Sequence, residues 1–377
     1  MVCGSAIIYA YVGEFYSKKN VDRAIMATAT IAAIGAILLP VLAWLIINSD
    51  FTIYIPFLGI SYGQWRLYIT VCAIPGLLSG LAFFGLPESP KFLLSVGEEK
   101  EALRIIVEVM KKDDVGLYAQ NLELKEIEAL KPISEEEHSN RGLKNLKNML
   151  NQTLLLFSKK YLKITSLMCF LQMMIYATSS GMYMWFPDIL NSITEFTKEN
   201  PDTQNTLCNI YGGKLEKLFN VTDVMNNCNS KFEISTYTYS IITDISVVVG
   251  CGIFTYIITK VPNTFLIWIT LTLCGLATIA EGIISSPTVS IYLYIILINS
   301  WLVIAVVSSA TASLYPTSLR VMAVNMSIMF GRIGASLGAN FIGALLKGHC
   351  ELTFYICGAI MCFTGFVAFL IPKPKTN

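Results

Sequence analysis

The stretch LYITVCAIPGLLSGLAFFGL occupies residues 67–86 and contains no charged side chain. It is followed at once by PESPKFLL, residues 87–94, and then by a stretch rich in lysine and glutamate. An α-helix of roughly 20 apolar residues reaches about 30 Å, which is the thickness of the hydrocarbon core of a bilayer. The boundary at Leu86 therefore predicts the end of a membrane-spanning helix.

Composition places the whole chain in the same class. Of its 377 residues, 54% are hydrophobic and 14% are charged, and the mean hydropathy is +0.59. About a quarter of the residues of a soluble domain are charged, so this chain does not cover its own surface in water. Continuous apolar runs are typical of spanning helices, whereas the strands of a barrel alternate. The predicted fold class is an all-α polytopic membrane protein, and the net charge of +1 gives no indication of a nucleic-acid partner.

Apolar runs recur along the chain, and the basic residues between them are divided unevenly. Twenty of the 27 lysines and arginines fall at one set of span ends, and six fall at the other. The positive-inside rule therefore places residues 87–161 and the C-terminus in the cytosol, and residues 188–236 in the lumen or outside. The nine predicted spans are 2–15, 24–48, 67–86, 162–187, 237–258, 264–284, 289–313, 322–346 and 352–371.

Residues 87–161 form a predicted cytosolic linker with short helices. Ser89 is a favourable N-cap residue, and Pro90 suits the first helical position after it. Residues 98–112 carry apolar side chains on one helical face and charges on the other, which predicts a helix lying against the inner ends of the spans.

Four stretches carry a resemblance to a known family. PESPKFLL is similar to the signature that follows the sixth helix in the sugar-porter and organic-ion branch of the major facilitator superfamily. The longer stretch at residues 62–103 resembles the synaptic vesicle glycoprotein 2 family, as do GMYMWFPDIL at 181–190 and LYPTSLR at 314–320. The four matches have the same order along the chain as in that family, and the resemblance covers nearly the whole sequence.

The resemblance implies twelve helices in two halves of six. Because residues 87–94 follow the sixth helix in the family, the span at 2–15 corresponds to its fourth. We therefore expect this chain to be a truncated product or an incomplete gene model that lacks the first three helices, with transport impaired for that reason. Residues 1–86 are then the remnant of the N-terminal half (family helices 4–6), and residues 162–377 are the C-terminal half.

Two loops repeat between the halves. GEFYSKKNVDRAIMA, residues 13–27, leads into the second span, and SLYPTSLRVMAV, residues 313–324, leads into the eighth. Each places an arginine just before an apolar helix start. We expect these cytosolic loops, with the PESP motif, to act as gate elements, and we expect Glu14 to pair with a loop arginine. The residues concerned are Glu14, Arg23, Glu88 and Arg320.

The resemblance further implies that the first, fourth and seventh spans line a central cavity. These spans carry an unusual number of polar and aromatic residues for membrane helices. Trp185 is expected in an aromatic belt at the membrane interface. The deeper residues Tyr176, Ser180, Asn299 and Ser308 are the candidates for contact with a solute.

Charged residues within spans indicate functional positions more specifically than polar or aromatic ones, because each charge costs a few kcal/mol at the centre of a bilayer. Arg332 lies too deep in the eighth span to reach water easily, and we expect it to face the interior and to meet either a solvent path in the cavity or an acidic partner, for which Asp244 is the first candidate. Glu281 lies near the outer end of the sixth span. The glycines around Arg332, at positions 331, 334 and 338, are expected to allow close helix packing.

The loop at residues 188–236 is expected to lie in an oxidising compartment. Cys208 and Cys228 both fall within it and are predicted to form a disulfide, while Cys350 lies on the same side and competes for that pairing. Asn220 begins an Asn-Val-Thr sequon in the same loop and is the predicted glycosylation site. No cysteine or histidine spacing in the sequence matches a zinc site, and no cofactor is expected.

Two classes of function follow. The first is a secondary transporter of a small organic solute, coupled to protons or another ion, which works by alternating access. The second is a non-transporting membrane glycoprotein of synaptic-vesicle type, which binds a protein partner through its luminal loop. No Ser-His-Asp set, His pair or phosphate loop favours an enzyme. The membrane is expected to be the plasma membrane or that of a secretory vesicle.

The chain also departs from the family pattern. Vertebrate synaptic vesicle members carry a tryptophan and an aspartate where this chain has Ile304 and Ser308. They carry paired tyrosines where it has Ser179 and Ser180. For these reasons the resemblance does not assign the solute or the coupling ion.

Overall fold

The computed structural model describes most of the predicted spans. It covers residues 21–49, 52–56, 59–88, 93, 101, 104–105, 156–200, 205–219, 233–258, 260–315 and 317–372. Several predictions lie outside the described residues: the span at 2–15 with Glu14, most of the linker at 87–161, Asn220 and Cys228.

The first part of the described chain is a helical pair joined by a hairpin. Two short antiparallel strands place Thr52 opposite Gly63, and Gly59 has a φ of +62° in the turn between them, a conformation that glycine adopts without strain. The sequence analysis did not predict this hairpin. The elements are α2 (Val21–Ile47), β1 (Thr52–Ile55), β2 (Ile60–Gly63) and α3 (Gln64–Phe83).

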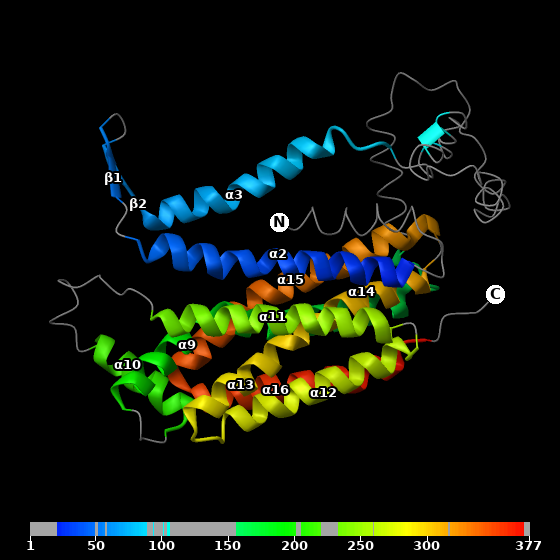
Figure 1. Ribbon diagram of the computed structural model, residues 1–377. Coiled ribbons are helices and arrows are strands. Elements are labelled where there is room, and N and C mark those ends of the chain that lie inside the picture. Colours follow the sequence, from blue (N-terminus) through cyan, green and yellow to red (C-terminus); the bar gives the residue numbers. More distant parts are fainter. Residues whose placement is uncertain are drawn as a thin grey trace.

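The second part is a bundle of longer helices (Figure 1). Its first helix, α9, continues well past residue 187, where the predicted span ends. One predicted span is a composite of α13 and α14, with the 3₁₀ turn η1 between them. The elements are α9 (Leu162–Glu199), α10 (Leu207–Phe219), α11 (Ile234–Ile257), α12 (Asn263–Glu281), α13 (Pro287–Ile298), η1 (Asn299–Trp301), α14 (Leu302–Leu314), α15 (Thr317–Gly348), α16 (Cys350–Val367) and η2 (Ala368–Leu370).

Length and apolar composition identify the membrane helices. Within the described residues, seven helical segments are long and apolar enough to cross a bilayer, and each coincides with a predicted span. Helix α9 is long enough as well, with 38 residues, but its polar residues keep it outside that set. The protein is therefore a multi-pass helical membrane protein whose most polar long helix is α9.

A seam of glycines joins α9 to α15. A Cβ atom added at Gly334 would collide with the backbone oxygen of Met173, and one added at Gly338 would collide with that of Ala177. Gly331 likewise lies directly against the ring of Tyr176. The prediction that these three glycines allow close packing is confirmed, because no larger residue fits without moving the opposite helix.

A second close approach joins α12 to α16. A Cβ atom at Gly275 would lie 2.8 Å from the carbonyl oxygen of Gly358, and one at Gly358 would lie 2.7 Å from that of Gly275. Around these two seams the apolar side chains form two large buried clusters. One lies towards α10 and includes Tyr211 and Tyr294, and the other lies towards the opposite end and includes Met168 and Ile267.

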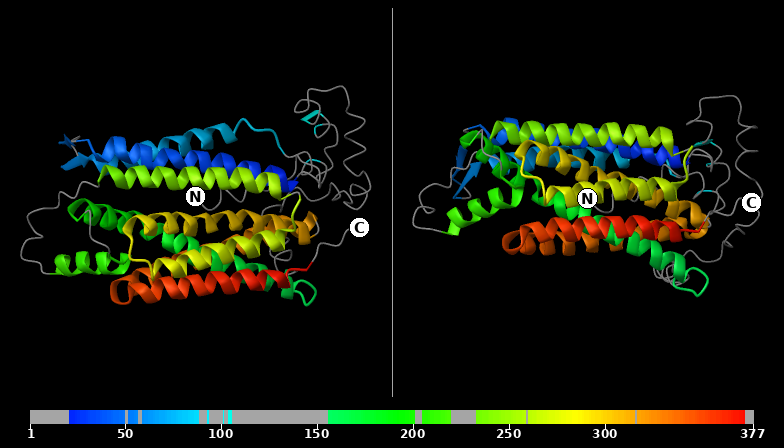
Figure 2. Two further views of the ribbon diagram at one scale, coloured as in Figure 1. Left: turned by 60° about the horizontal axis from the view of Figure 1, so that its bottom comes forward. Right: turned by 90° about the horizontal axis from the view of Figure 1, so that it is seen from below.

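The connections fall alternately at the two ends of the bundle (Figures 1 and 2). The hairpin, α10, the α12–α13 turn and the α15–α16 turn share one end, and the start of α9 and the α14–α15 turn share the other. This grouping agrees with the predicted alternation of sides. We refer to the end that carries α10 as the outer end. Helix α2 packs along α11, and α3 lies beyond α2, where most of its side chains are exposed.

Candidate functional site

Helix α9 presents polar side chains to the 3₁₀ turn and α14. Gln172 and Ser179 are two turns apart on α9, and both are buried. Gln172 Nε2 donates a hydrogen bond of 3.0 Å to Ser308 Oγ, and the hydroxyls of Ser179 and Ser300 lie 2.7 Å apart. Each of the two side chains therefore has one partner on the facing segment, which fixes the rotation of α9 against η1 and α14, while Gln172 Oε1 has no partner among the described residues.

Three aromatic rings form a row across the same region. The ring centroids of Tyr176 and Trp301 are 5.8 Å apart in an edge-on arrangement, and those of Tyr183 and Trp301 are 6.2 Å apart. The turn η1 places Trp301 between the two tyrosines of α9. Tyr183 is 40% exposed and Trp301 is half-buried, so the row is open on one side. We call Tyr176, Trp301 and Tyr183 the aromatic row.

Arg332 of α15 lies at one end of the aromatic row. Its guanidinium carbon is 5.2 Å from the centroid of the Tyr176 ring, a cation–π contact. Its Nε is buried and has no hydrogen-bond partner among the described residues. The expectation that Arg332 faces protein rather than lipid agrees with this position.

Of the two alternatives expected for Arg332, an ion pair with Asp244 is not found in the described part of the chain. Within the described part of the chain, the ion pairs are Lys198–Glu233 and Arg104–Glu101, both exposed. Asp244 of α11 is 7% exposed and acts electrostatically on Tyr183, at the other end of the aromatic row. The two charges are thus separated by the row. Opposite charges in two spans did not pair because the rotation of α11 and α15 directs them to different rings.

The remaining cavity candidates are held in different ways. Ser308 takes part through its bond with Gln172. Asn299 donates to Ser246 Oγ of α11 at 3.0 Å and to the carbonyl oxygen of Ile295, so it ties η1 to α11. Ser180 is buried, and its hydroxyl has no hydrogen-bond partner within the described ranges.

Trp185, which is expected at the membrane interface, packs against α15. Its Nε1 donates a hydrogen bond of 3.0 Å to the carbonyl oxygen of Ala339, and its ring fills the space left by Gly343 of α15. The tryptophan therefore belongs to the seam between α9 and α15. Gln172 and Trp301 take roles that the sequence analysis did not assign, although the spacing of Gln172, Tyr176, Ser179 and Tyr183 on one helical face was visible in it.

The candidate gate residues lie at the opposite end from α10. Arg23 and Glu88 are exposed, and Arg320 at the start of α15 is half-buried with an Nε that has no hydrogen-bond partner among the described residues. No ion pair joins these three within the described part of the chain.

The outer end carries a disulfide different from the predicted one. Cys208 of α10 is bonded to Cys350 at the start of α16, with 5.4 Å between the two Cα atoms. The predicted Cys208–Cys228 pairing is wrong, and the competing residue is the partner. Helix α10 packs against the outer ends of α9 and α16, which brings Cys208 to residue 350 across 142 positions of sequence.

A hydrogen bond fixes the other side of α10. Tyr211 Oη donates to Asp188 Oδ2 of α9 at 2.8 Å. Burial, together with this hydrogen bond and the charge of Asp188, raises the pKa of Tyr211 well above its usual value. Tyr211 therefore remains a neutral donor at every physiological pH. The disulfide and this bond make α10 a fixed cap on the bundle.

Parts of the chain are similar in sequence to known transporters and synaptic vesicle glycoproteins. Residues 3–179 match the family model described as "Sugar (and other) transporter". The chain is 31% identical to synaptic vesicle glycoprotein 2B of Rattus norvegicus over 103 residues, which is 27% of this chain and 15% of that relative. It is 24% identical to synaptic vesicle glycoprotein 2A of the same species over 204 residues, 50% of this chain and 27% of the relative. The matched stretches thus span much less than two thirds of these relatives.

Among solved structures, the chain resembles the proton:xylose symporter XylE of the major facilitator superfamily, bound to 6-bromo-6-deoxy-D-glucose. The TM-score is 0.57 at 13% sequence identity, over 98% of this chain and 68% of the symporter chain.

The chain therefore shares the fold of this symporter. Its N-terminal part is similar to the sugar and other transporters, and shorter stretches of it are similar to the synaptic vesicle glycoproteins 2.

Proposed function

We propose that this protein is a secondary transporter of a small organic solute, and that the aromatic row with Arg332 and Asp244 forms the C-terminal wall of its binding site. The observation that carries the proposal is the open row itself. A half-buried arginine and a buried aspartate lie at its two ends, on helices that otherwise face lipid or each other. Charges at this depth are retained where they serve a solute or ion path.

The family suggests the first solutes to test. Sugars stack on aromatic rings through their C–H faces and hydrogen-bond through their hydroxyls, and Trp301 offers a ring beside the hydroxyls of Ser300 and Ser308. The fold suggests alternating access, in which helices of the two halves rock about the site. The helices α2 and α3 then belong to the opposite wall, and residues 87–161 link the halves.

Uptake by proteoliposomes tests the proposal. The chain is reconstituted, and uptake of radiolabelled D-xylose, D-glucose and a panel of small organic acids and amines is measured with and without a proton gradient. Saturable uptake of one compound that Trp301→Ala abolishes would support the assignment. Ile333→Ala is the matched control, because Ile333 is 45% exposed on the outer face of α15.

The same assay addresses whether transport by the chain is impaired. The aromatic row forms one wall, and among the described residues the opposite wall consists of α2 and α3, so a solute is held mainly from one side and binds weakly. We expect uptake by this chain to be weak. Binding of a solute with no uptake would favour an impaired transporter, whereas the absence of both from the whole panel would count against the transporter assignment.

A second function is favoured by the outer end. Helix α10 is fixed by the disulfide and by Tyr211, and beside it lies a depression of about 370 Å³ lined by Gly212, Lys347, His349 and Glu351. A fixed polar cap of this kind suits a membrane glycoprotein that binds a protein partner in the lumen or outside the cell. Loss of partner binding on reduction of the disulfide, with solute uptake absent, would favour this function.

Localisation follows the same reasoning. The excess of basic residues at the end opposite α10 favours a cytosolic C-terminus, in the plasma membrane or a secretory vesicle. Glycosylation at Asn220, removed by a glycosidase and absent from Asn220→Gln, tests the outward position of the loop.

A further inference from the structure

Glu281 is buried in a way that no interaction in the described structure explains. It is the last residue of α12 and is 1% exposed. Neither of its carboxyl oxygens has a hydrogen-bond partner among the described residues. Ser290 of α13 faces it, yet the hydroxyl of Ser290 is also buried without a partner in the described part of the chain. The fold thus holds a carboxyl close to one hydroxyl that influences it as a hydrogen-bonding group, although no hydrogen bond of regular geometry joins the two among the described residues.

The surroundings of Glu281 offer no positive charge. On α13 the facing titratable group is Tyr294, and around Tyr294 lie Cys357 of α16 and Tyr211 of α10. Helix α14, which also packs on α12, contains no titratable residue. No lysine, arginine or histidine is paired with Glu281 in the described ranges. An ionised carboxylate held this way costs several kcal/mol, whereas a protonated carboxyl is neutral and gains a donor for Ser290 Oγ.

The position of Glu281 is also enclosed. The ring of Tyr355 of α16 lies against Gly282, where an added Cβ would come within 2.9 Å of it, and Tyr355 Oη reaches the carbonyl oxygen of Gly282 at 3.4 Å. The seam of Gly275 and Gly358 lies about two turns deeper. Glu281 itself is 1% exposed, so a proton reaches it past neighbouring side chains.

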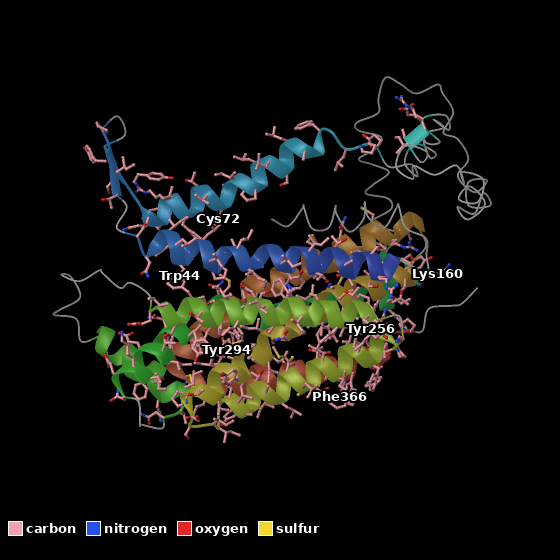
Figure 3. The ribbon with its side chains drawn as sticks, in the orientation of Figure 1. Trp44, Cys72, Lys160, Tyr256, Tyr294 and Phe366 are labelled. Atoms are coloured by element: carbon pink, nitrogen blue, oxygen red, sulfur yellow. A yellow bond between two sulfur atoms is a disulfide. The ribbon has the colours of Figure 1, made fainter. Side chains whose placement is uncertain are left out.

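Two tyrosines lie on the outer side of Glu281. Tyr294 is fully buried, within electrostatic range of both Glu281 and Tyr211, and is labelled in Figure 3 in the part of the bundle nearer α10. The hydroxyl of Tyr211 is bonded to Asp188, which is half-buried at the outer end. Tyr294 also donates to the carbonyl oxygen of Met182, next to Tyr183 of the aromatic row. Tyr294 therefore lies near Glu281 and is also hydrogen-bonded to α9, the helix that carries the proposed solute site.

We propose that Glu281 is a proton-binding site, which takes up and releases a proton on the outer side through Tyr294 and Tyr211. The proton is the ligand, and no other reactant is required. Coupling of this proton to solute movement, through Tyr294 and α9, depends on the proposed transport function. Binding of the proton by Glu281 does not depend on it, so binding and coupling are tested separately.

Infrared difference spectroscopy of the full chain in lipid vesicles tests the site without any solute. The carbonyl stretch of a protonated carboxyl is followed while the outer pH is changed between about 5 and 9. We expect a band that disappears reversibly as the pH rises and that is absent from Glu281→Gln, which mimics the neutral carboxyl and keeps the fold. Glu199→Gln is the matched control, because Glu199 is an exposed carboxyl at the same end, and it should leave the band intact.

Two results would overturn the site: a pH-dependent band that survives in Glu281→Gln, or a Glu281 band that stays unchanged over the whole pH range. Tyr211→Phe tests the route. It should slow the appearance of the band after an outer pH jump at least several-fold, and an unchanged rate would overturn entry through Tyr211. If a solute is transported, Glu281→Gln should make uptake independent of outer pH, and retained pH dependence would overturn the coupling.

Discussion

The seam between α9 and α15 and the pair of helices α2 and α3 both contain glycines, but these glycines have different surroundings. In the seam, an added Cβ at Gly334 or Gly338 strikes the backbone of the facing helix. On α2 and α3, a Cβ at Gly35, Gly76 or Gly80 meets nothing within 4 Å. The comparison teaches that a glycine in an apolar helix indicates close packing only where a second helix lies against its face.

The two regions differ in polar contacts as well. Helix α9 is held by buried side-chain hydrogen bonds to η1 and α14. Between α2 and α3, the side-chain bond in the described residues is Tyr68 to the carbonyl oxygen of Leu39, long at 3.4 Å and exposed. Figure 3 shows Trp44 and Cys72 in this sparsely filled region and Tyr294 within the larger bundle. The bundle is therefore the rigid part of the described molecule, and each test below pairs a residue of the bundle with one of α2 or α3.

Gly338→Ala is expected to have the largest effect. Its new methyl group collides with the carbonyl oxygen of Ala177, which has no freedom to move, so the free energy of unfolding should fall by about 3 kcal/mol. Gly35→Ala on α2 should be neutral or slightly stabilising. Thermal unfolding in nanodiscs, followed by circular dichroism, measures both. Equal effects would contradict the difference between the two regions.

Cys350→Ser is expected to come next. Loss of the Cys208–Cys350 disulfide releases α10 and should lower the free energy of unfolding by about 2–4 kcal/mol. It should also make Cys208 reactive towards a thiol reagent in the intact membrane. Cys72→Ser on α3, which removes a free cysteine, should change neither stability nor labelling of Cys208. An unreactive Cys208 in Cys350→Ser would contradict the assigned pairing.

Arg332→Ala tests the aromatic row. Removing its charge should weaken solute binding about tenfold, in line with a cation–π contact of about 1–2 kcal/mol in a desolvated site. Arg66→Ala is the matched control, because Arg66 also lies over a ring, that of Trp65 at 4.9 Å, but on α3. Equilibrium binding of whichever solute is taken up measures the affinity of both variants. An equal loss of affinity in the two would contradict the proposal that the aromatic row is part of the binding site.

Tyr211→Phe is expected to have the smallest effect. It removes one hydrogen bond to a half-buried carboxylate and should lower the free energy of unfolding by about 1.5 kcal/mol. Tyr62→Phe, which removes a hydroxyl from the exposed edge near α3, should change it by less than about 0.5 kcal/mol. Chemical unfolding of the two variants in matched detergent distinguishes them. A larger loss of unfolding free energy in Tyr62→Phe than in Tyr211→Phe would contradict the view that the bundle holds the stronger polar contacts.

Much of the fold was predictable from the sequence. The seven membrane helices fall where the apolar runs predict them, and the three glycines near Arg332 pack as expected. The end of α9 was not predictable, since residues 188–199 have the composition of a loop. They remain helical because Ile189, Leu190 and Ile193 are buried against the outer cluster.

The candidate site was predictable only in part. Tyr176 and Arg332 were named as separate candidates, and the structure joins them in one contact. The disulfide partner of Cys208 was predicted wrongly, and of the two alternatives for Arg332 the ion pair with Asp244 is not found among the described residues. Both results concern which two side chains meet across two helices, and in neither case which helix carries them.

Hydropathy and charge determined the class of membrane protein, the positions of the spans and the alternation of sides. The reason is that each helix must satisfy the bilayer by itself, so the residues of that helix and its flanking loops suffice for the prediction. Only the tertiary structure decided the contacts: Arg332 over Tyr176, Cys208 bonded to Cys350, Trp185 against Gly343, and Glu281 enclosed without a partner. Lipid and neighbouring helix are equally apolar, so composition does not fix the rotation of one helix against another. Glycine seams and a few buried hydrogen bonds set that rotation, and they act only when both helices are present.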